Sequence, residues 1–400
     1  MAEQSYGPQA GRRWLRAAAI GLLSLAAAGC QIVPRVERPL PPPAEEPAPP
    51  PTRAEPPAPP PVIPRDDDRH RVAVLIPLSG ANAGVGQSLL NAAQLALLDT
   101  GGERIRVTAY DTANGAAAAA NEALADGNGL FLGPLLAEDV RAVAPAARQA
   151  RVPVIAFSND IGVAGEGVYI VGFNPGQSIE RVVAHARAAG AQRFGALVPT
   201  GIYGQRASQA MIAAVERSGG RMVGMQGFDR SEAGLRNAVA RLTGQGQYDA
   251  VLVADTSRLA ASAAPLLRQG SPDVRVLGTE LWATESDLSD HAALRGAWYA
   301  AASDAMFDQF RARYRARYQA NPYRLSSLGY DAALLAIRVA ADWPLNRPFP
   351  AALLRDRGGY IGLDGIFRFG ADGVAERALE VREVRAGGSD VVAPAPRAFD

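Results

Sequence analysis

A pair of glycines after an apolar segment is the first feature of the sequence that could support chemistry. Gly84 and Gly86 follow the apolar run at residues 72–76 and precede a segment rich in Ala and Leu. A strand, a glycine-containing loop and a helix are the elements that hold the phosphates of a dinucleotide. The third glycine of that fingerprint is missing, because Leu89 stands at its position. We therefore expect no dinucleotide and no other cofactor.

The side chains that most often catalyse hydrolysis or bind metals are few. The chain has three histidines, His70, His185 and His291, and one cysteine, Cys30. No histidine stands beside a nucleophile in a recognisable motif, and no His, Cys and carboxylate cluster has the spacing of metal ligands. Residues distant in sequence could still meet in the fold. We expect a protein that is not an enzyme and holds no metal.

The charged residues exclude further classes of protein. Lysine is absent, so all 41 basic residues are arginine. A P-loop, a Schiff base and the lysine motifs of penicillin-binding serine enzymes are therefore impossible. The formal net charge of +1 gives no field that would attract nucleic acid.

Short apolar runs alternate with helix-like segments from residue 71 onward. Runs apolar on both faces and separated by helices predict parallel sheets covered on both sides. There are too many runs for one comfortable sheet, and residues 172–175 (GFNP) interrupt the pattern. We predict two doubly wound lobes. Because ligands of such sheets bind at the carboxyl ends of the strands, residues 77–80 (PLSG) should lie at the mouth of a cleft.

Several motifs in order resemble the type I periplasmic binding proteins, the leucine/isoleucine/valine-binding family. They are 74–80 (VLIPLSG), 110–112 (YDT), 133–134 (GP), 152–158 (VPVIAFS), 173–175 (FNP), 203–204 (YG), 328–332 (LGYDA) and 362–369 (GLDGIFRF). The resemblance covers roughly residues 71–385. It implies an α/β fold whose chain crosses a hinge three times. Residues 71–173 and 305–358 would form one lobe, 174–304 and 359–385 the other, and 386–400 a tail.

One branch of that family is more similar. Residues 77–80, 110–112 and 133–136 (GPLL) resemble the C-terminal domain of penicillin-binding-protein activators of the LpoA type. The resemblance implies a lipoprotein that binds and stimulates a bifunctional peptidoglycan synthase. Those relatives carry a helical-repeat domain where this chain has a proline-rich segment. The alternative is a solute receptor of an ABC importer for amino acids or similar small polar ligands.

The same resemblance assigns candidate ligand contacts in the cleft. By position these are Ser79, Gly80, Ser158, Tyr203, Asp255 and Glu280. The hydroxyls would bind a carboxylate, and the acidic side chains an ammonium group. Turn capping and hinge packing explain the serines and the tyrosine equally well, and helix capping or a salt bridge explains the acids. The loop after Gly133 carries Leu135 and Leu136 where the family usually has hydroxyl donors.

The N-terminal residues resemble a lipoprotein signal. Arg12, Arg13 and Arg16 precede an apolar stretch at residues 17–28 that is too short to span a bilayer permanently. Small residues then lead to Cys30, as in the lipobox of bacterial lipoproteins, so we expect a signal peptide at 1–29 and lipidation of Cys30. A cleaved signal near an unrelated cysteine is the alternative. In that family, Gln31 in place of Asp indicates the outer membrane.

Residues 30–70 are expected to be a tether rather than a domain. The segment is dominated by Pro, Ala, Glu and Arg and has almost nothing to bury. Such a composition favours an extended polyproline II chain, which spans on the order of 100 Å over 35 residues. The membrane would then be contacted through the lipid alone, with the folded part facing the periplasm.

Overall fold

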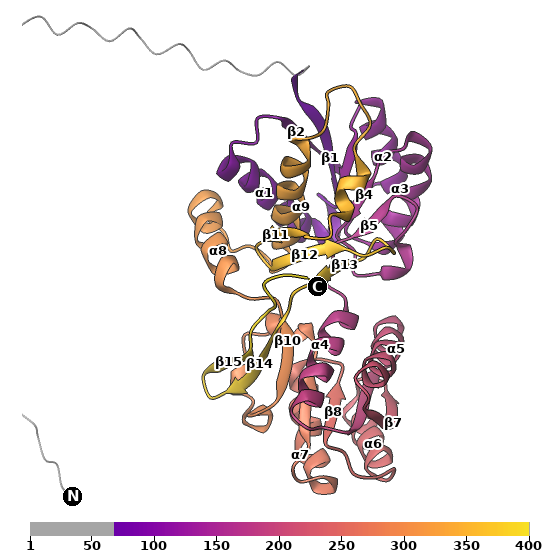
Figure 1. Ribbon diagram of the computed structural model, residues 1–400, viewed down its shortest axis with the longest axis vertical. Helices are drawn as coiled ribbons and strands as arrows, with labels where there is room; N and C mark the ends of the chain where they lie inside the picture. Colours follow the sequence, from indigo (N-terminus) through magenta and orange to yellow (C-terminus); the bar gives the residue numbers. More distant parts are fainter. Residues whose placement is uncertain (1–67, 400) are drawn as a thin grey trace, which may run out of the picture. The chain divides into compact units, whose positions relative to one another are not determined.

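The computed structural model describes residues 68–399 (Figure 1). The predicted signal peptide, the lipidation of Cys30 and nearly all of the predicted tether lie outside these residues. None of the helices within the described part is long and apolar enough to cross a membrane.

The first lobe is built on a five-stranded parallel sheet. Its strand order is β2-β1-β3-β4-β5. The strands are β1 (His70–Ile76), β2 (Ile105–Asp111), β3 (Leu130–Leu132), β4 (Val154–Ala156) and β5 (Val168–Ile170). The helices of this lobe are α1 (Ala83–Thr100), α2 (Ala116–Ala125), α3 (Ala137–Ala150), α8 (Ala305–Tyr318) and α9 (Ser326–Ala340).

The central strand β1 shows why this sheet needs helices on both faces. Val72, Val74 and Ile76 pack toward α1, α8 and α9, whereas Ala73 and Leu75 pack toward α2 and α3. All five side chains are fully buried. A strand without a polar face is stable only between two covering layers, as the apolar run at residues 72–76 predicts.

The second lobe repeats the plan with a seven-stranded sheet of order β15-β14-β10-β9-β8-β6-β7. The strands are β6 (Arg193–Pro199), β7 (Arg221–Phe228), β8 (Ala250–Val253), β9 (Arg275–Gly278), β10 (Trp298–Ala301), β14 (Glu380–Arg385) and β15 (Gly388–Ala393). The helices are α4 (Pro175–Ala188), α5 (Ile202–Arg217), α6 (Glu232–Thr243) and α7 (Ser257–Gly270). Helices α4 and α5 cover one face and α6 and α7 the other. Strands β14 and β15 are antiparallel and form one edge.

A third, antiparallel sheet corrects the predicted lobe boundary. It consists of β11 (Tyr360–Gly362), β12 (Gly365–Phe369) and β13 (Ala375–Arg377). We expected residues 359–385 in the second lobe, but Phe367 and Phe369 belong to the first lobe's core, where Phe369 contacts Tyr169 edge to face. The aromatic side chains of β12 therefore hold residues 360–377 on the first lobe. In the segment expected as a tail, residues 388–393 form β15.

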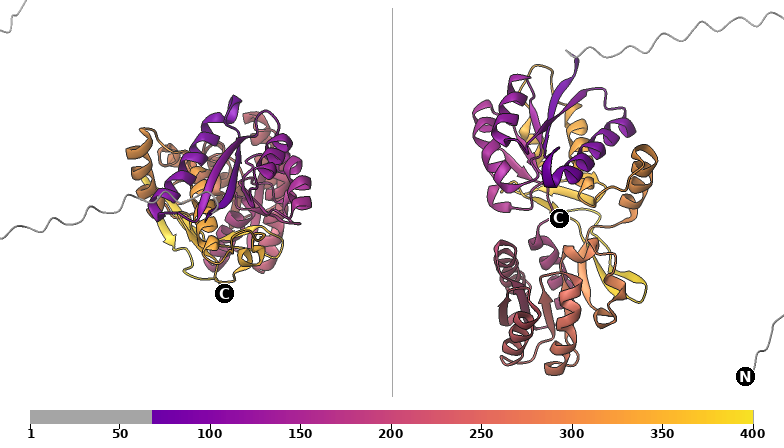
Figure 2. Two further views of the ribbon diagram at one scale, coloured as in Figure 1. Left: turned by 90° about the horizontal axis from the view of Figure 1, so that it is seen from above. Right: turned by 180° about the vertical axis from the view of Figure 1, so that it is seen from behind.

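The chain passes between the lobes three times among the described residues. The passages are residues 171–174 after β5, 302–304 after β10 and 378–379 after β13. The predicted architecture of two layered α/β lobes joined by a three-crossing hinge is confirmed (Figures 1 and 2). The last described residues return to this region, where Arg368 of β12 stacks over the Phe399 ring at 4.6 Å.

Candidate ligand cavity between the lobes

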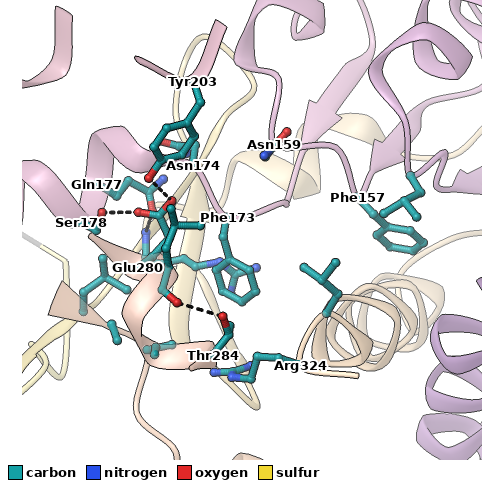
Figure 3. Close-up of a pocket in the computed structure, with 18 of the residues that line it drawn as sticks. Phe157, Asn159, Phe173, Asn174, Gln177, Ser178, Tyr203, Glu280, Thr284 and Arg324 are labelled. Carbon is teal, nitrogen blue, oxygen red and sulfur yellow. Dashed lines mark hydrogen bonds between the residues drawn. The ribbon is translucent and has the colours of Figure 1, made fainter. Parts of the chain in front are cut away.

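A cavity of about 420 Å³ lies where the two lobes and the hinge meet. Its size is within the range of small-molecule sites. The first lobe contributes a mainly apolar wall, which includes Val85, Leu135, Leu136, Phe157 and Leu325. The second lobe contributes a more polar wall, which includes Gln177, Ser178, Tyr203, Glu280 and Thr284 (Figure 3). Most of these residues follow strands or begin helices, as expected for ligands at the carboxyl ends of parallel strands.

Glu280 is the centre of a hydrogen-bond network on the second-lobe wall. Its carboxylate accepts hydrogen bonds from Ser178 and from the Tyr203 hydroxyl, the latter at 3.1 Å (Figure 3). The Tyr203 hydroxyl is also 3.0 Å from Thr279 Oγ1. Burial raises the pKa of Glu280. Burial, followed by the nearby Glu280 charge, raises the pKa of Tyr203. Of the six predicted contacts, Tyr203 and Glu280 thus line the cavity.

The other predicted contacts lie elsewhere. Ser79 donates to Asp111 Oδ2 at 2.7 Å, which ties the loop after β1 to the end of β2. Gly80 is exposed and does not line the cavity. The Ser158 hydroxyl is buried and accepts the backbone N–H of Asp160 at 3.0 Å. One of the predicted hydroxyls therefore joins two loops of the first lobe, and the other serves a local turn.

Asp255 is also held within the protein rather than presented to the cavity. It is buried, and its Oδ2 accepts a hydrogen bond from Arg230 Nε at 2.7 Å. Its Oδ1 accepts the backbone N–H of Thr256 at 2.8 Å. The carboxylate is therefore engaged by a charged side chain and by the residue that caps α7.

Asn174 and Arg377 have buried donor atoms without a hydrogen-bond partner among the described residues. Asn174 caps the N-terminus of α4, and its Oδ1 accepts the backbone N–H of Gly176 at 3.0 Å. This bond identifies the remaining amide atom as Nδ2, a buried donor with no partner among residues 68–399. Arg377 donates through Nη2 to Val171 O at 2.8 Å, but its Nε and Nη1 make no hydrogen bond within the described chain. Both side chains line the cavity.

Two buried carboxylates, Asp331 and Asp364, lie close to each other. Asp331 of α9 is 3.8 Å from Arg377 Nη1 and accepts the backbone N–H of Leu363 at 2.7 Å. Asp364 lies 2.6 Å from Arg324. Burial, and then the proximity of Asp364, raises the pKa of Asp331 to about 7. Two guanidinium groups and two carboxylates thus lie together beside the hinge in a water-poor environment.

A charged group also joins the two lobes directly. Asp160 of the first lobe accepts hydrogen bonds from Arg206 of α5 in the second lobe and from Arg141 of α3 in its own lobe. Burial alone would raise the pKa of Asp160, but the bonds from Arg206 and the backbone of Gly162 hold it below its usual value. The carboxylate therefore stays charged and bridges the two lobes.

Sequence reasoning missed Asn174, Ser178, Arg206 and Arg377 as site residues. One signal was present: residues 173–175 (FNP) read as a helix start, because Asn is a good N-cap and Pro is favoured at the first helical position. That signal predicts the cap but not the cavity behind it. The arginines had no local signal, because the groups they contact are distant in sequence.

The described residues contain no group of three His, Cys, Asp or Glu side chains that could hold a metal ion.

Among curated proteins, the chain matches an uncharacterized protein of Rickettsia prowazekii with 28% identity over 142 residues. That match spans 35% of this chain and 38% of the relative.

Solved structures with the same fold include both solute receptors and a regulator. The leucine-binding protein LivK of Thermotoga maritima is 22% identical, with a TM-score of 0.59, over 82% of this chain and 98% of that one. The C-domain of LpoA from Haemophilus influenzae, described as a regulator of PBP1A, is 19% identical, with a TM-score of 0.64, over 81% and 100%. A solute-binding protein of Rhodopseudomonas palustris in complex with 3,4-dihydroxybenzoic acid is 19% identical, with a TM-score of 0.61, over 83% and 98%.

These solved structures share the fold of this chain. Their sequence identities to it are too low to assign their functions to it. The family model described as periplasmic binding protein matches residues 70–389, which is most of the chain. The two lobes, the three-crossing hinge and the cavity between them agree with that match. The chain belongs to the periplasmic binding protein family.

Proposed function

We propose that this chain is a non-catalytic lipoprotein that binds a bifunctional penicillin-binding protein and stimulates peptidoglycan synthesis. It would act from the outer membrane, facing the periplasm, through contact between protein surfaces. Transport of an amino acid would instead require a complete binding site for the carboxylate and ammonium groups of the ligand.

The observation that carries the proposal is the composition of the first-lobe wall. Leu135 and Leu136 occupy it where amino-acid receptors of the family usually supply hydroxyl donors. The hydroxyls of Ser79 and Ser158 are engaged with Asp111 and with the backbone of Asp160. A carboxylate bound against this wall would lack its usual partners, at a cost of about 1–3 kcal/mol for each unmet group.

Two further features support a regulatory role. The structural likeness to the LpoA C-domain extends over all of that domain, and that protein is described as a regulator of PBP1A. The lipobox-like residues before Cys30 and the proline-rich segment after it would suit a protein that reaches a synthase from the outer membrane. Both features support a protein partner, and neither concerns the cavity.

The test is a glycan-polymerisation assay with purified bifunctional penicillin-binding proteins from the same cell. We expect the full chain to be retained by one such synthase in a pull-down and to raise its initial rate. A leucine-binding protein of the same fold, added at equal concentration, is the control. Absence of both binding and rate change with every bifunctional synthase of the cell would contradict the proposal.

A second candidate function is that of a solute receptor for an ABC importer. The observation that favours it is the cavity of about 420 Å³ with Glu280, Ser178 and Tyr203 in its wall. Isothermal calorimetry with a panel of the twenty amino acids distinguishes this candidate. Micromolar binding of one amino acid would support the receptor, whereas flat traces across the panel would rule out this substrate class.

A further inference from the structure

Helix α8 concentrates positive charge on one part of the first lobe, outside the cavity. Four of its 14 residues are arginines, and one, Asp308, is acidic. The arginines are Arg311, Arg313, Arg315 and Arg317, and all of them are exposed. The formal net charge of the whole chain is only +1. These arginines therefore form a basic surface on a protein that is nearly neutral as a whole.

The fold does not use the arginines to hold the helix in place. The buried residues of α8 are Phe307, Phe310 and Tyr314, which belong to the core of the first lobe. The Phe310 ring lies 5.4 Å from that of Tyr330 in α9. The apolar side of α8 is therefore already covered by the lobe. A helix that lies in a membrane surface needs an exposed apolar side, so α8 lacks the feature that lipid binding would require.

The arginines are arranged in two rows along the helix, because side chains four residues apart lie on the same side of a helix. The rows are Arg311 with Arg315 and Arg313 with Arg317. The exposed positions between the rows, 312 and 316, are alanines on the side opposite the buried residues. Small side chains at these positions let another molecule come close to the helix, with guanidinium groups on both flanks.

Two of the four arginines have carboxylate partners within the fold. Arg311 lies 3.0 Å from Asp308, and Arg313 lies 3.4 Å from a carboxylate near the end of α1. Arg315 and Arg317 form no ion pair within residues 68–399. Both lie in the last turn of α8, where the helix dipole favours cations. The helix therefore tolerates these two charges, and they remain available to another molecule.

Large exposed side chains in and near α8 indicate the kind of partner. Met306 of α8 is 45% exposed, and Tyr323, shortly after the helix, is 52% exposed. Arginine, methionine and tyrosine are enriched in protein interfaces, and arginine and tyrosine often carry much of the binding energy. Figures 1 and 2 show α8 at the outer edge of the first lobe, where a second protein can reach it. The composition thus favours a protein partner, and the charge favours an acidic one.

We propose that the basic surface of α8 docks an acidic surface of a partner protein. The partner is the peptidoglycan synthase of the proposed function, so this inference rests on that function. Arg315 and Arg317 form ion pairs with carboxylates of the synthase, and the alanines at 312 and 316 allow the close approach. Charges placed in this way speed association and make it sensitive to salt.

The experiment measures the affinity of a purified bifunctional synthase for the full chain and for two double variants. Arg315→Gln/Arg317→Gln removes the two arginines of α8 that make no ion pair in the described fold. Arg258→Gln/Arg295→Gln is the matched control, because both arginines are exposed on the second lobe and also make no ion pair within residues 68–399. Each variant loses two positive charges, and each should keep the thermal midpoint of the unmodified chain.

We expect the α8 variant to bind the synthase about threefold to 30-fold more weakly than the unmodified chain, as for the loss of two surface ion pairs. Its affinity should also fall less than that of the unmodified chain when salt is raised from about 50 to about 300 mM. The control variant should bind within about twofold of the unmodified chain, because charges far from the interface are screened.

The outcomes separate this inference from the proposed function. If the unmodified chain binds the synthase and the α8 variant loses no more affinity than the control, the basic surface is not the docking site, and the proposed function stands. If the unmodified chain binds no bifunctional synthase of the cell, the proposed function fails and this inference fails with it.

A last measurement distinguishes a protein partner from a membrane. Vesicles of phosphatidylglycerol are sedimented with the chain carrying Cys30→Ser, which removes the predicted site of the lipid anchor. We expect the α8 substitutions to leave the sedimented fraction unchanged. Sedimentation with the vesicles that is lost in Arg315→Gln/Arg317→Gln, and kept in the control, would assign the basic surface to a lipid surface and overturn the proposal.

Discussion

Asp160 of the first lobe and Arg206 of the second lobe form an ion pair between the lobes. Asp160 is buried, and Arg206 also donates to the backbone oxygen of Asn159 at 3.3 Å. The pair adds a direct contact between the lobes to the chain connections of the hinge. We therefore expect it to favour the closed arrangement of the lobes.

Removal of this ion pair should open the lobes. A hydrogen bond between charged groups contributes about 1.5–3 kcal/mol, so Arg206→Met should shift the ratio of open to closed molecules by about tenfold to 100-fold. Spin labels at Leu98 of α1 and Ile212 of α5, both exposed, with Cys30 replaced by serine, would report the inter-lobe distance.

Arg141 provides the matched control for this prediction. It donates to the same carboxylate at 2.8 Å, but both residues belong to the first lobe. Arg141→Met should therefore leave the distance distribution unchanged. A distribution in Arg206→Met that coincides with that of the unmodified chain would show that the ion pair does not hold the lobes.

The stability of the chain should depend on pH through Asp331. Its pKa is raised from the ordinary value of about 4 to about 7, first by burial and then by Asp364. Between these values the folded chain binds more protons at this group than the unfolded chain. The free energy of unfolding contributed by Asp331 is therefore fully present below pH ~4 and is lost as the pH rises to ~7.

Asp331→Asn removes this contribution, since an amide does not titrate. Urea unfolding at pH 5 and pH 7 measures the free energy of unfolding at each pH. From pH 5 to pH 7 this free energy should decrease less in Asp331→Asn than in the unmodified chain, and the two slopes should differ by at most about 1.4 kcal/mol per pH unit. Asp273→Asn, at an exposed position of the second lobe, is the control and should keep the original dependence. A variant with the same slope as the unmodified chain would contradict a proton on Asp331 in this range.

A close approach of backbone recurs in the two lobes and predicts where side chains cannot be added. A Cβ on Gly86 of α1 would lie 1.8 Å from the carbonyl oxygen of Pro77, and one on Gly204 of α5 would lie 1.6 Å from that of Pro199. In both lobes a proline ends or follows the strand, and the next helix packs its first turns on that proline.

Gly86→Ala and Gly204→Ala should each lower the free energy of unfolding by about 1–3 kcal/mol, because a backbone carbonyl cannot move aside as a side chain can. Gly84→Ala is the control in the same helix: its Cβ would meet only the far end of the exposed Tyr323 side chain at 3.0 Å. Chemical denaturation of the three variants tests whether Gly86→Ala and Gly204→Ala are less stable than Gly84→Ala. Equal stability of all three would show that the close approach is not a constraint.

The fold could be predicted from the sequence because its signals are local. The apolar run in β1 requires two covering layers, and residues 173–175 carry the cap and proline that begin α4 at the first crossing of the hinge. The boundary near residue 358 was wrong because the side chains of β12 fit either lobe by composition. Only their packing against Tyr169 and α9 assigns them to the first.

The site was less predictable because its side chains have partners distant in sequence. Tyr203 and Glu280 line the cavity as expected, but Ser79 is engaged by Asp111 and Asp255 by Arg230. A polar residue near the end of a strand faces either the cavity or a neighbouring loop, and the sequence of that strand does not distinguish the two outcomes.

By itself the sequence determined the alternating layers, the break between the lobes and the absence of hydroxyl donors at Leu135 and Leu136. These features depend on which residues are adjacent in the chain. The tertiary structure alone decided that Asp160 joins Arg206 across the lobes and that Asn174 and Arg377 leave donors at the hinge. Hydrogen bonds and ion pairs act over a few ångströms, so their partners are set only when distant segments have packed together.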